Sequence, residues 1–119
     1  MTERRRYART SLDVELTVSG QNAVTGRSAR INARSQDISL GGMFVKTERP
    51  PALNSAIAIE LQLPDQKDVL VLPCVVRWVK DTEGMGVQFT TLDNRVTHAI
   101  VHYVATRPTP KPGKLQQQR

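Results

Sequence analysis

Four arginines lie within six residues in the stretch RRRYAR, at positions 4 to 9. A guanidinium pairs bidentately with phosphate and stacks on the face of a base, so clustered arginines suit an anionic ligand that carries a base. Arg5 and Arg9 are four positions apart, and Arg4 directly precedes them. The run therefore indicates either a clamp for such a ligand or a solvated tail, which is the commoner explanation of an isolated charge run.

A second group of polar residues, Asp37, Ser39 and Gly42, has the spacing D-x-S-x-x-G. Residues two apart in an extended segment point the same way, so Asp37 and Ser39 are expected to face outward together while Ile38 anchors the core. A carboxylate matches the two N–H groups on the Watson–Crick edge of guanine, and arginine matches its O6 and N7 acceptors. Gly42 has no Cβ and lets the backbone approach a ligand closely or take a positive φ.

Together these residues suit a guanine nucleotide phosphate better than a bare anion. Each motif alone also has a purely structural explanation, because Asp, Ser and Gly are ordinary turn residues. Their occurrence together, in this order, favours the ligand site.

Short antiparallel strands are expected to position both groups, because apolar and polar residues alternate along most of the chain. The predicted strands cover residues 11–19, 26–39, 41–48, 56–64, 69–80 and 86–89. Pro73 should lie at an edge or a bulge, since proline cannot donate to a ladder. Asp93 is the expected N-cap of a helix that runs to about Ala105. The apolar face of this helix is predicted to comprise Val96, Ile100, Tyr103 and Val104. The chain is therefore mainly β, a small barrel or sandwich capped by one helix.

The net charge of +6 is concentrated at the two ends of the chain. Residues 1–9 carry +3 and residues 107–119 carry +4, whereas residues 10–106 carry −1. This distribution argues against the broad cationic face of a duplex-binding domain and disfavours DNA as a partner. The single cysteine, Cys74, fits a small buried hydrophobe in a reducing compartment. No apolar stretch can span a bilayer, so we expect a cytoplasmic protein without a membrane span.

The motifs resemble those of the PilZ domain, the bacterial receptor module for the second messenger cyclic di-GMP. The R-x-x-x-R and D/N-x-S-x-x-G motifs of that family match Arg5 and Arg9, and Asp37, Ser39 and Gly42. A third block, VVRWVKDTEGMGVQF at 75–89, is similar to the family's pattern of an apolar strand, a turn and a G-x-G-V-x-F strand. The resemblance extends over residues 3–106.

This resemblance implies a six-stranded antiparallel β-barrel with a C-terminal α-helix. It implies that Arg5 and Arg9 grip the phosphates and guanine of cyclic di-GMP. Asp37 and Ser39 would then meet a guanine edge, and Gly42 would allow the close approach. An arginine just before the first motif tends to favour an intercalated pair of ligands in this family. Because Arg4 occupies that place, two stacked ligands are expected.

The resulting prediction is a non-enzymatic cyclic di-GMP receptor with three parts. Residues 1–10 would be a flexible arginine-rich ligand-binding segment, 11–106 the PilZ β-barrel and helix, and 107–119 a disordered basic tail. The dianionic ligand would relieve the repulsion among the arginines and order the first segment, which a downstream protein of unknown identity would then recognise. The alternatives are a ligand-independent protein adaptor and a nucleic-acid binder that uses its basic tails.

Five other residues are candidates for ligand contacts or for packing. His98 and His102 are spaced i, i+4, but they lie on the polar helix face without a supporting Cys or acidic cluster, so no metal site is predicted. Trp78 is interpreted as a packing anchor rather than a stacking platform. Arg30 and Arg34 either extend the ligand surface or belong to a wet strand face. No catalytic set of residues is present, so we expect no enzymatic activity and no cofactor.

Overall fold

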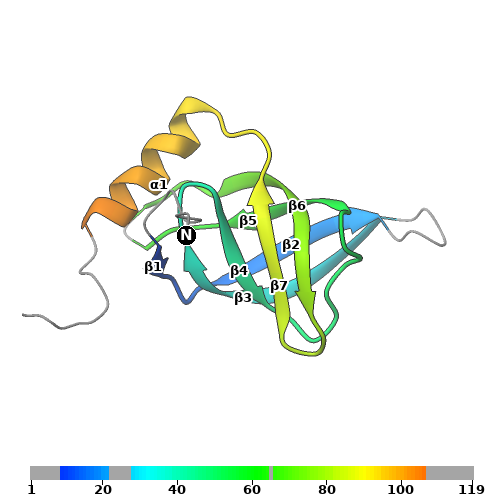
Figure 1. Ribbon diagram of the computed structural model, residues 1–119. Coiled ribbons are helices and arrows are strands. Elements are labelled where there is room, and N and C mark those ends of the chain that lie inside the picture. Colours follow the sequence, from blue (N-terminus) through cyan, green and yellow to red (C-terminus); the bar gives the residue numbers. More distant parts are fainter. Residues whose placement is uncertain (1–8, 22–27, 65, 107–119) are drawn as a thin grey trace, which may run out of the picture.

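A closed β-barrel with one helix across its end forms the body of the protein (Figure 1). The computed structural model describes residues 9–21, 28–64 and 66–106. Its elements are β1 (Thr10–Ser11), β2 (Glu15–Gln21), β3 (Ser28–Ile38), β4 (Gly42–Lys46), β5 (Ala56–Leu61), β6 (Leu70–Lys80), β7 (Gly84–Phe89) and α1 (Asn94–Thr106).

Antiparallel pairing joins every neighbouring pair of strands in the order β1-β3-β2-β5-β6-β7-β4. β3 also pairs with β4, and this contact closes the sheet on itself. Within the described residues, β2 to β7 thus make a six-stranded barrel, and the two-residue β1 adds a short edge to β3. The predicted fold class is confirmed.

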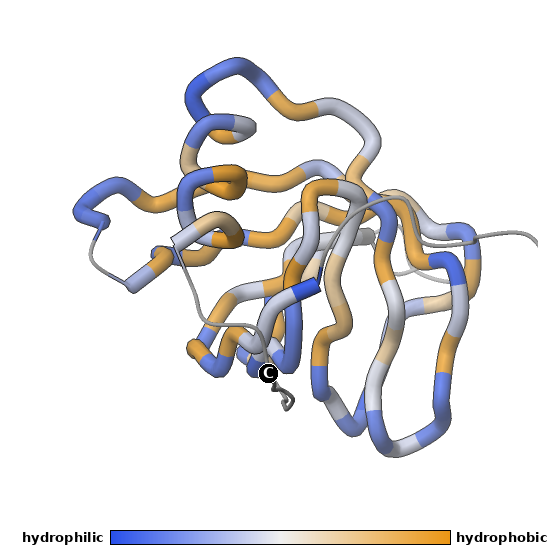
Figure 2. Tube along the Cα trace, turned by 60° about the vertical axis from the view of Figure 1, so that its left-hand side comes forward, coloured by the Kyte–Doolittle hydropathy of each residue, from blue (hydrophilic) through white to orange (hydrophobic). Residues whose placement is uncertain are grey.

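The core fills the barrel because apolar residues of neighbouring strands meet in the same rows. Val18 lies opposite Ile59, and Ile59 lies opposite Leu72, and all three side chains are at most 2% exposed. Figure 2 shows the corresponding alternation of hydrophobic and hydrophilic residues along the strands. Cys74 belongs to this core, and burial raises the pKa of its thiol to about 12. The prediction that Cys74 is a small buried hydrophobe is therefore confirmed.

Helix α1 begins as its cap predicts and docks by its apolar face. The Asp93 carboxylate accepts a hydrogen bond from the N–H of Val96 at 2.9 Å. The buried residues of the helix are Val96, Ile100 and Tyr103, and Val104 is partly buried. The hydroxyl of Tyr103 donates to the carbonyl of Ser11 at 2.9 Å, which connects the helix to β1. Among the described residues, no helix is long and apolar enough to cross a membrane.

The predicted strand 11–19 is divided into β1 and β2 by residues 12–14. Ser35 explains the division, because its buried hydroxyl donates to the carbonyl of Leu12 and accepts from the N–H of Val14 at 3.0 Å. A side chain thus replaces part of the regular ladder at this point. The alternation of apolar residues continues through the break, so it could not reveal this interruption.

Pro73 lies neither at a sheet edge nor at a bulge, contrary to the prediction. It sits within β6 opposite Ala58, and the ladder between β6 and β7 ends one residue away at Cys74 and Phe89. The Pro73 carbonyl accepts the N–H of Thr90, the residue that follows β7, at 2.9 Å. The nitrogen and the carbonyl of a residue in an antiparallel strand point to the same side, so the Pro73 nitrogen also faces beyond the end of β7. The missing N–H therefore interrupts no ladder bond.

The turn between β6 and β7 holds Thr82 at a φ of 62°, in the left-handed region. A β-branched residue is strained there by roughly 1 to 2 kcal/mol, whereas asparagine tolerates this region better. We expect Thr82→Asn to raise the free energy of unfolding by about 0.5 to 1 kcal/mol in chemical denaturation. Thr91→Asn is the matched control because its φ is not positive. Equal changes in both variants would contradict this interpretation.

Candidate functional site

Pairing of β1 with β3 brings the two predicted motifs together. The register places Ser11 opposite Asp37, so Arg9, which precedes β1, lies beside the Asp37 carboxylate. Ser39 and Gly42 flank the turn that connects β3 to β4. One cavity of about 600 Å³ on the outer wall of the barrel is lined by all four motif residues, Arg9, Asp37, Ser39 and Gly42. Arg4 and Arg5 lie outside the described residues, as do most of the predicted flexible segment and the predicted basic tail.

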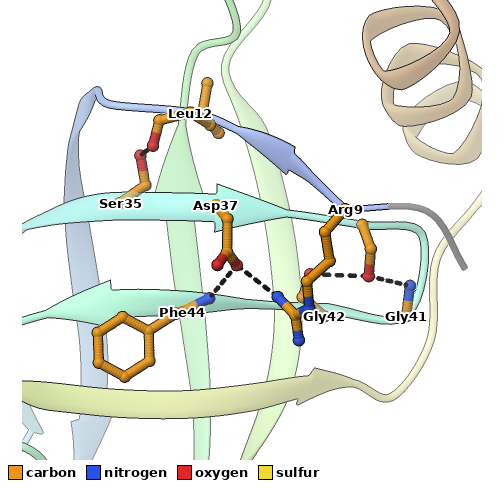
Figure 3. A network of polar contacts seen from close by, with 8 residues as sticks. Arg9, Leu12, Ser35, Asp37, Gly41, Gly42 and Phe44 are labelled. Atoms are coloured by element: carbon orange, nitrogen blue, oxygen red, sulfur yellow. Dashed lines mark hydrogen bonds and ion pairs between the residues drawn. The ribbon is translucent and has the colours of Figure 1, made fainter. Parts of the chain in front are cut away.

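Asp37 is held in a fixed orientation with one oxygen available. Its Oδ1 forms an ion pair with the guanidinium of Arg9 and accepts the N–H of Phe44 at 3.2 Å (Figure 3). Its Oδ2 accepts no hydrogen bond from any residue that the structure describes. The side chain is 24% exposed. A carboxylate oriented in this way can accept an N–H donor from a ligand without first reorganising.

Ser39 does not face outward with Asp37 as predicted. β3 ends at Ile38, so the alternation of an extended strand no longer applies, and Ser39 is only 5% exposed. Its hydroxyl accepts the N–H of Gly41 at 3.2 Å and donates to the carbonyl of Gly42 at 3.3 Å. Ser39 therefore stabilises the turn, and it contributes to the cavity as part of its wall.

Gly42 is required by strand pairing, and of the two alternatives given for it, a close approach of backbone or a positive φ, the positive φ is not the one adopted. A Cβ at this position would lie 2.1 Å from the carbonyl oxygen of Val87 on β7. The close approach that the missing side chain allows is thus between two strands of the barrel. Gly42 still lines the cavity, but the geometry gives it a structural role there.

An aromatic pair in the cavity wall was missed by the sequence interpretation. Asp37, Phe44, Gly86 and Trp78 follow one another across β3, β4, β7 and β6. The rings of Phe44 and Trp78 are stacked, with centroids 5.2 Å apart. Trp78 packs against Phe44, as the prediction of a packing anchor requires, but 50% of it remains exposed, so its free face could also stack on a base. A Cβ on Gly86 would lie 2.1 Å from the indole nitrogen of Trp78, so the ring needs a glycine at this position. A glycine in β7 opposite a tryptophan in β6 was the sequence signal that could have indicated where this ring lies.

Charged residues of β6 and of the turn that follows it also line the cavity. Arg77 donates through Nε to the side-chain oxygen of Gln88 at 2.6 Å, and Lys80 pairs with Glu83 at 3.2 Å. The cavity therefore combines cationic groups at both sides with an aromatic surface between them. This combination suits a ligand with phosphates and planar bases.

The other candidates lie away from this cavity. Arg30 pairs with Glu60 at 2.9 Å and Arg34 with Asp13 at 2.6 Å, and neither arginine lines the cavity, so both belong to a wet strand face. His98 and His102 are exposed on α1. In residues 9–21, 28–64 and 66–106, no three or more His, Cys, Asp or Glu side chains are grouped so as to hold a metal.

Comparison with known proteins extends over nearly the whole chain. The sequence profile of the PilZ domain matches residues 3–106. No curated protein matches the chain. Among solved structures, MotI (DgrA), the inhibitor of motility of Bacillus subtilis, is 18% identical with a TM-score of 0.71 over 87% of this chain. YcgR of Escherichia coli, in complex with c-di-GMP, is 18% identical with a TM-score of 0.69, also over 87%.

The PilZ domain of CeSA, from a cellulose-synthesizing bacterium, is 19% identical with a TM-score of 0.61 over 82% of this chain and 95% of its own. The chain spans about half of the two longer structures, 51% of MotI and 46% of YcgR. At this identity the three structures show a shared barrel fold. With a profile match of this extent and with this barrel, the chain belongs to the PilZ domain family.

Proposed function

We propose that this protein is a receptor for cyclic di-GMP that performs no chemistry on it. The observation that carries the proposal is the Asp37 carboxylate, which Phe44 and Arg9 orient in the cavity wall with Oδ2 left available. Guanine offers two neighbouring N–H donors on its Watson–Crick edge, and a carboxylate is the acceptor that matches them. The family is one of cyclic di-GMP receptors, which supports the assignment.

Binding would change the partner of Arg9. A guanine that uses both carboxylate oxygens competes with Arg9 for Oδ1 of Asp37. Arg9 is then available to the phosphates of the ligand, where a charge-assisted bidentate contact replaces the one it loses. Arg4 and Arg5 are close to Arg9 in sequence and would add charge at the same place. A ligand-dependent ordering of the arginine segment is a surface change that a downstream protein could recognise.

Calorimetric titration of the intact protein with cyclic di-GMP tests the proposal. We expect saturable heat with a Kd of tens of micromolar or below, where specific nucleotide binding registers. Trp78 is the only tryptophan of the chain and lines the cavity, so its fluorescence should change over the same range of ligand concentration. A stoichiometry near two would agree with the intercalated pair predicted from Arg4.

GMP is the matched control ligand, because it carries a guanine and a phosphate without the cyclic dinucleotide frame. We expect it to bind much more weakly. The absence of heat with cyclic di-GMP would rule out the receptor function. Salt-sensitive binding of DNA by the same protein would then favour the nucleic-acid alternative.

A further inference from the structure

Arg77 occupies a bulge that turns it out of the regular strand pattern. In the ladder between β6 and β7, Val76 pairs with Val87 and Trp78 pairs with Gly86, so Arg77 is the additional, unpaired residue. A bulge of this kind redirects side chains and is frequent beside binding sites. Here both Arg77 and its neighbour Trp78 line the cavity, which two consecutive residues of a regular strand would not do.

The guanidinium of Arg77 is braced but not neutralised. Its Nε donates to the side-chain oxygen of Gln88, and its Nη groups bond to no residue in the described part of the chain. The other described cations that line the cavity have acidic partners, since Arg9 pairs with Asp37 and Lys80 with Glu83. Arg77 is thus an oriented cation whose two terminal nitrogens are available to acceptor atoms of a ligand.

Arg77 lies across the cavity from the carboxylate that we assign to guanine. β4 and β7 separate the strand of Asp37 from the strand of Arg77, so the two backbones are three strand spacings, or about 14 Å, apart along the curved wall of the barrel. Phe44 belongs to β4, and the ring of Trp78 lies over Gly86 of β7, so the stacked rings cover the two strands between them. Cyclic di-GMP is two-fold symmetric, with two guanines, so it can be recognised at two separated places.

We propose that Arg77 reads a second guanine through the O6 and N7 acceptors of its major-groove edge. This inference rests on the proposed function. A guanine is favoured over a phosphate as the partner because Gln88, which orients the guanidinium, is two residues from Gly86, over which the half-exposed Trp78 ring lies. A planar base gains contact area on such a ring, and a phosphate does not. Asp37 and Arg77 would then recognise opposite edges of different guanines.

The test compares two ligands and three proteins by calorimetry. The ligands are cyclic di-GMP and its 7-deazaguanine analogue, which lacks the N7 acceptors. The proteins are the intact chain, Arg77→Gln and Arg34→Gln, a control that removes an exposed arginine of the wet strand face. We expect Arg77→Gln to weaken binding of cyclic di-GMP by about 10- to 100-fold, as for a lost bidentate arginine–guanine contact, and Arg34→Gln to change it less than threefold.

The analogue distinguishes a base contact from a phosphate contact. The intact protein should bind the analogue about tenfold more weakly than cyclic di-GMP, and this ratio should fall at least threefold in Arg77→Gln. Arg77→Lys should remain weakened, because lysine keeps the charge but not the planar fork. Unaltered melting temperatures of the variants would show that the barrel is intact.

Two results would overturn the assignment while leaving the receptor function in place. Arg77→Gln could bind cyclic di-GMP as tightly as the intact protein does. Alternatively, the loss of affinity on changing from cyclic di-GMP to the analogue could be the same in Arg77→Gln as in the intact protein. With a reduced salt dependence of binding in Arg77→Gln, this result would identify a phosphate contact instead. Failure of the intact protein to bind cyclic di-GMP would reject the proposed function itself, before any variant is compared.

Discussion

Asp37→Ala should lower the affinity for cyclic di-GMP by about 100-fold while the barrel remains folded. The substitution removes the acceptor for guanine N–H groups, and a polar ligand edge left without its partner in a binding site typically costs 2 to 4 kcal/mol, or about 30- to 1,000-fold. It also releases Arg9, whose described partner is this carboxylate. The loss of stability should be small, because Asp37 is part of the outer wall and only the N–H of Phe44 loses a hydrogen bond within the sheet.

Calorimetry with Asp37→Ala, Asp37→Asn and Arg34→Ala would check this expectation. The asparagine variant keeps the shape of the side chain and one acceptor oxygen, and the family motif admits asparagine at this position, so its affinity should fall less than that of Asp37→Ala. Arg34 lies on the same strand as Asp37 and also takes part in ion pairs, but it does not line the cavity. Arg34→Ala should therefore leave the affinity within threefold. An Asp37→Ala protein that binds the ligand normally would show that guanine is recognised elsewhere.

Gly42→Ala should destabilise the protein by more than about 3 kcal/mol, which is beyond the effect of most single substitutions. The added Cβ would lie 2.1 Å from the carbonyl oxygen of Val87. The Cβ is held rigidly by the backbone of β4 and the oxygen belongs to the backbone of β7, so the clash can be relieved only by moving β4 away from β7. In a closed barrel that movement also disturbs the neighbouring pairs, because no edge is free to shift.

Gly20→Ala is the matched control for this prediction. There the nearest atom to the added Cβ is the side-chain Cγ2 of Ile57 at 3.1 Å, which can adjust, so the change should stay within about 1 kcal/mol. Chemical denaturation of both variants gives the comparison. If Gly42→Ala is as stable as Gly20→Ala, the strand-pairing role of Gly42 is wrong, and a direct role toward the ligand becomes the better explanation.

The barrel was largely predictable because its signal is carried by many residues. Alternation of apolar positions, such as Ile57, Ile59 and Leu61, indicates which face of a strand is buried, and one capping residue, Asp93, indicated where the helix begins. The same signal cannot locate an interruption. Ser35 replaces ladder bonds between β1 and β2 without disturbing the alternation.

The site was predictable only in part. Asp37 and Arg9 are brought together by β1, a strand of two residues that is too short to leave a pattern in sequence. The bulge at Arg77 shifts the register by one residue, and this shift exposes Trp78, which strict alternation from Val76 would bury. The outward orientation expected for Ser39 was wrong because the strand ends one residue earlier.

The hydrogen bond between Tyr103 and Ser11 has a consequence for how the protein is made. Its two residues are 92 positions apart, and Ser11 lies two residues after Arg9. Contacts of such high sequence separation form late, because the entropy of closing the loop must be met first. On the ribosome, β1 can pair with β3 as soon as both strands have emerged, but it gains the contact with Tyr103 only after helix α1 has emerged as well. Docking of β1 against the helix is therefore expected to be one of the last steps in forming the cavity wall that holds Arg9.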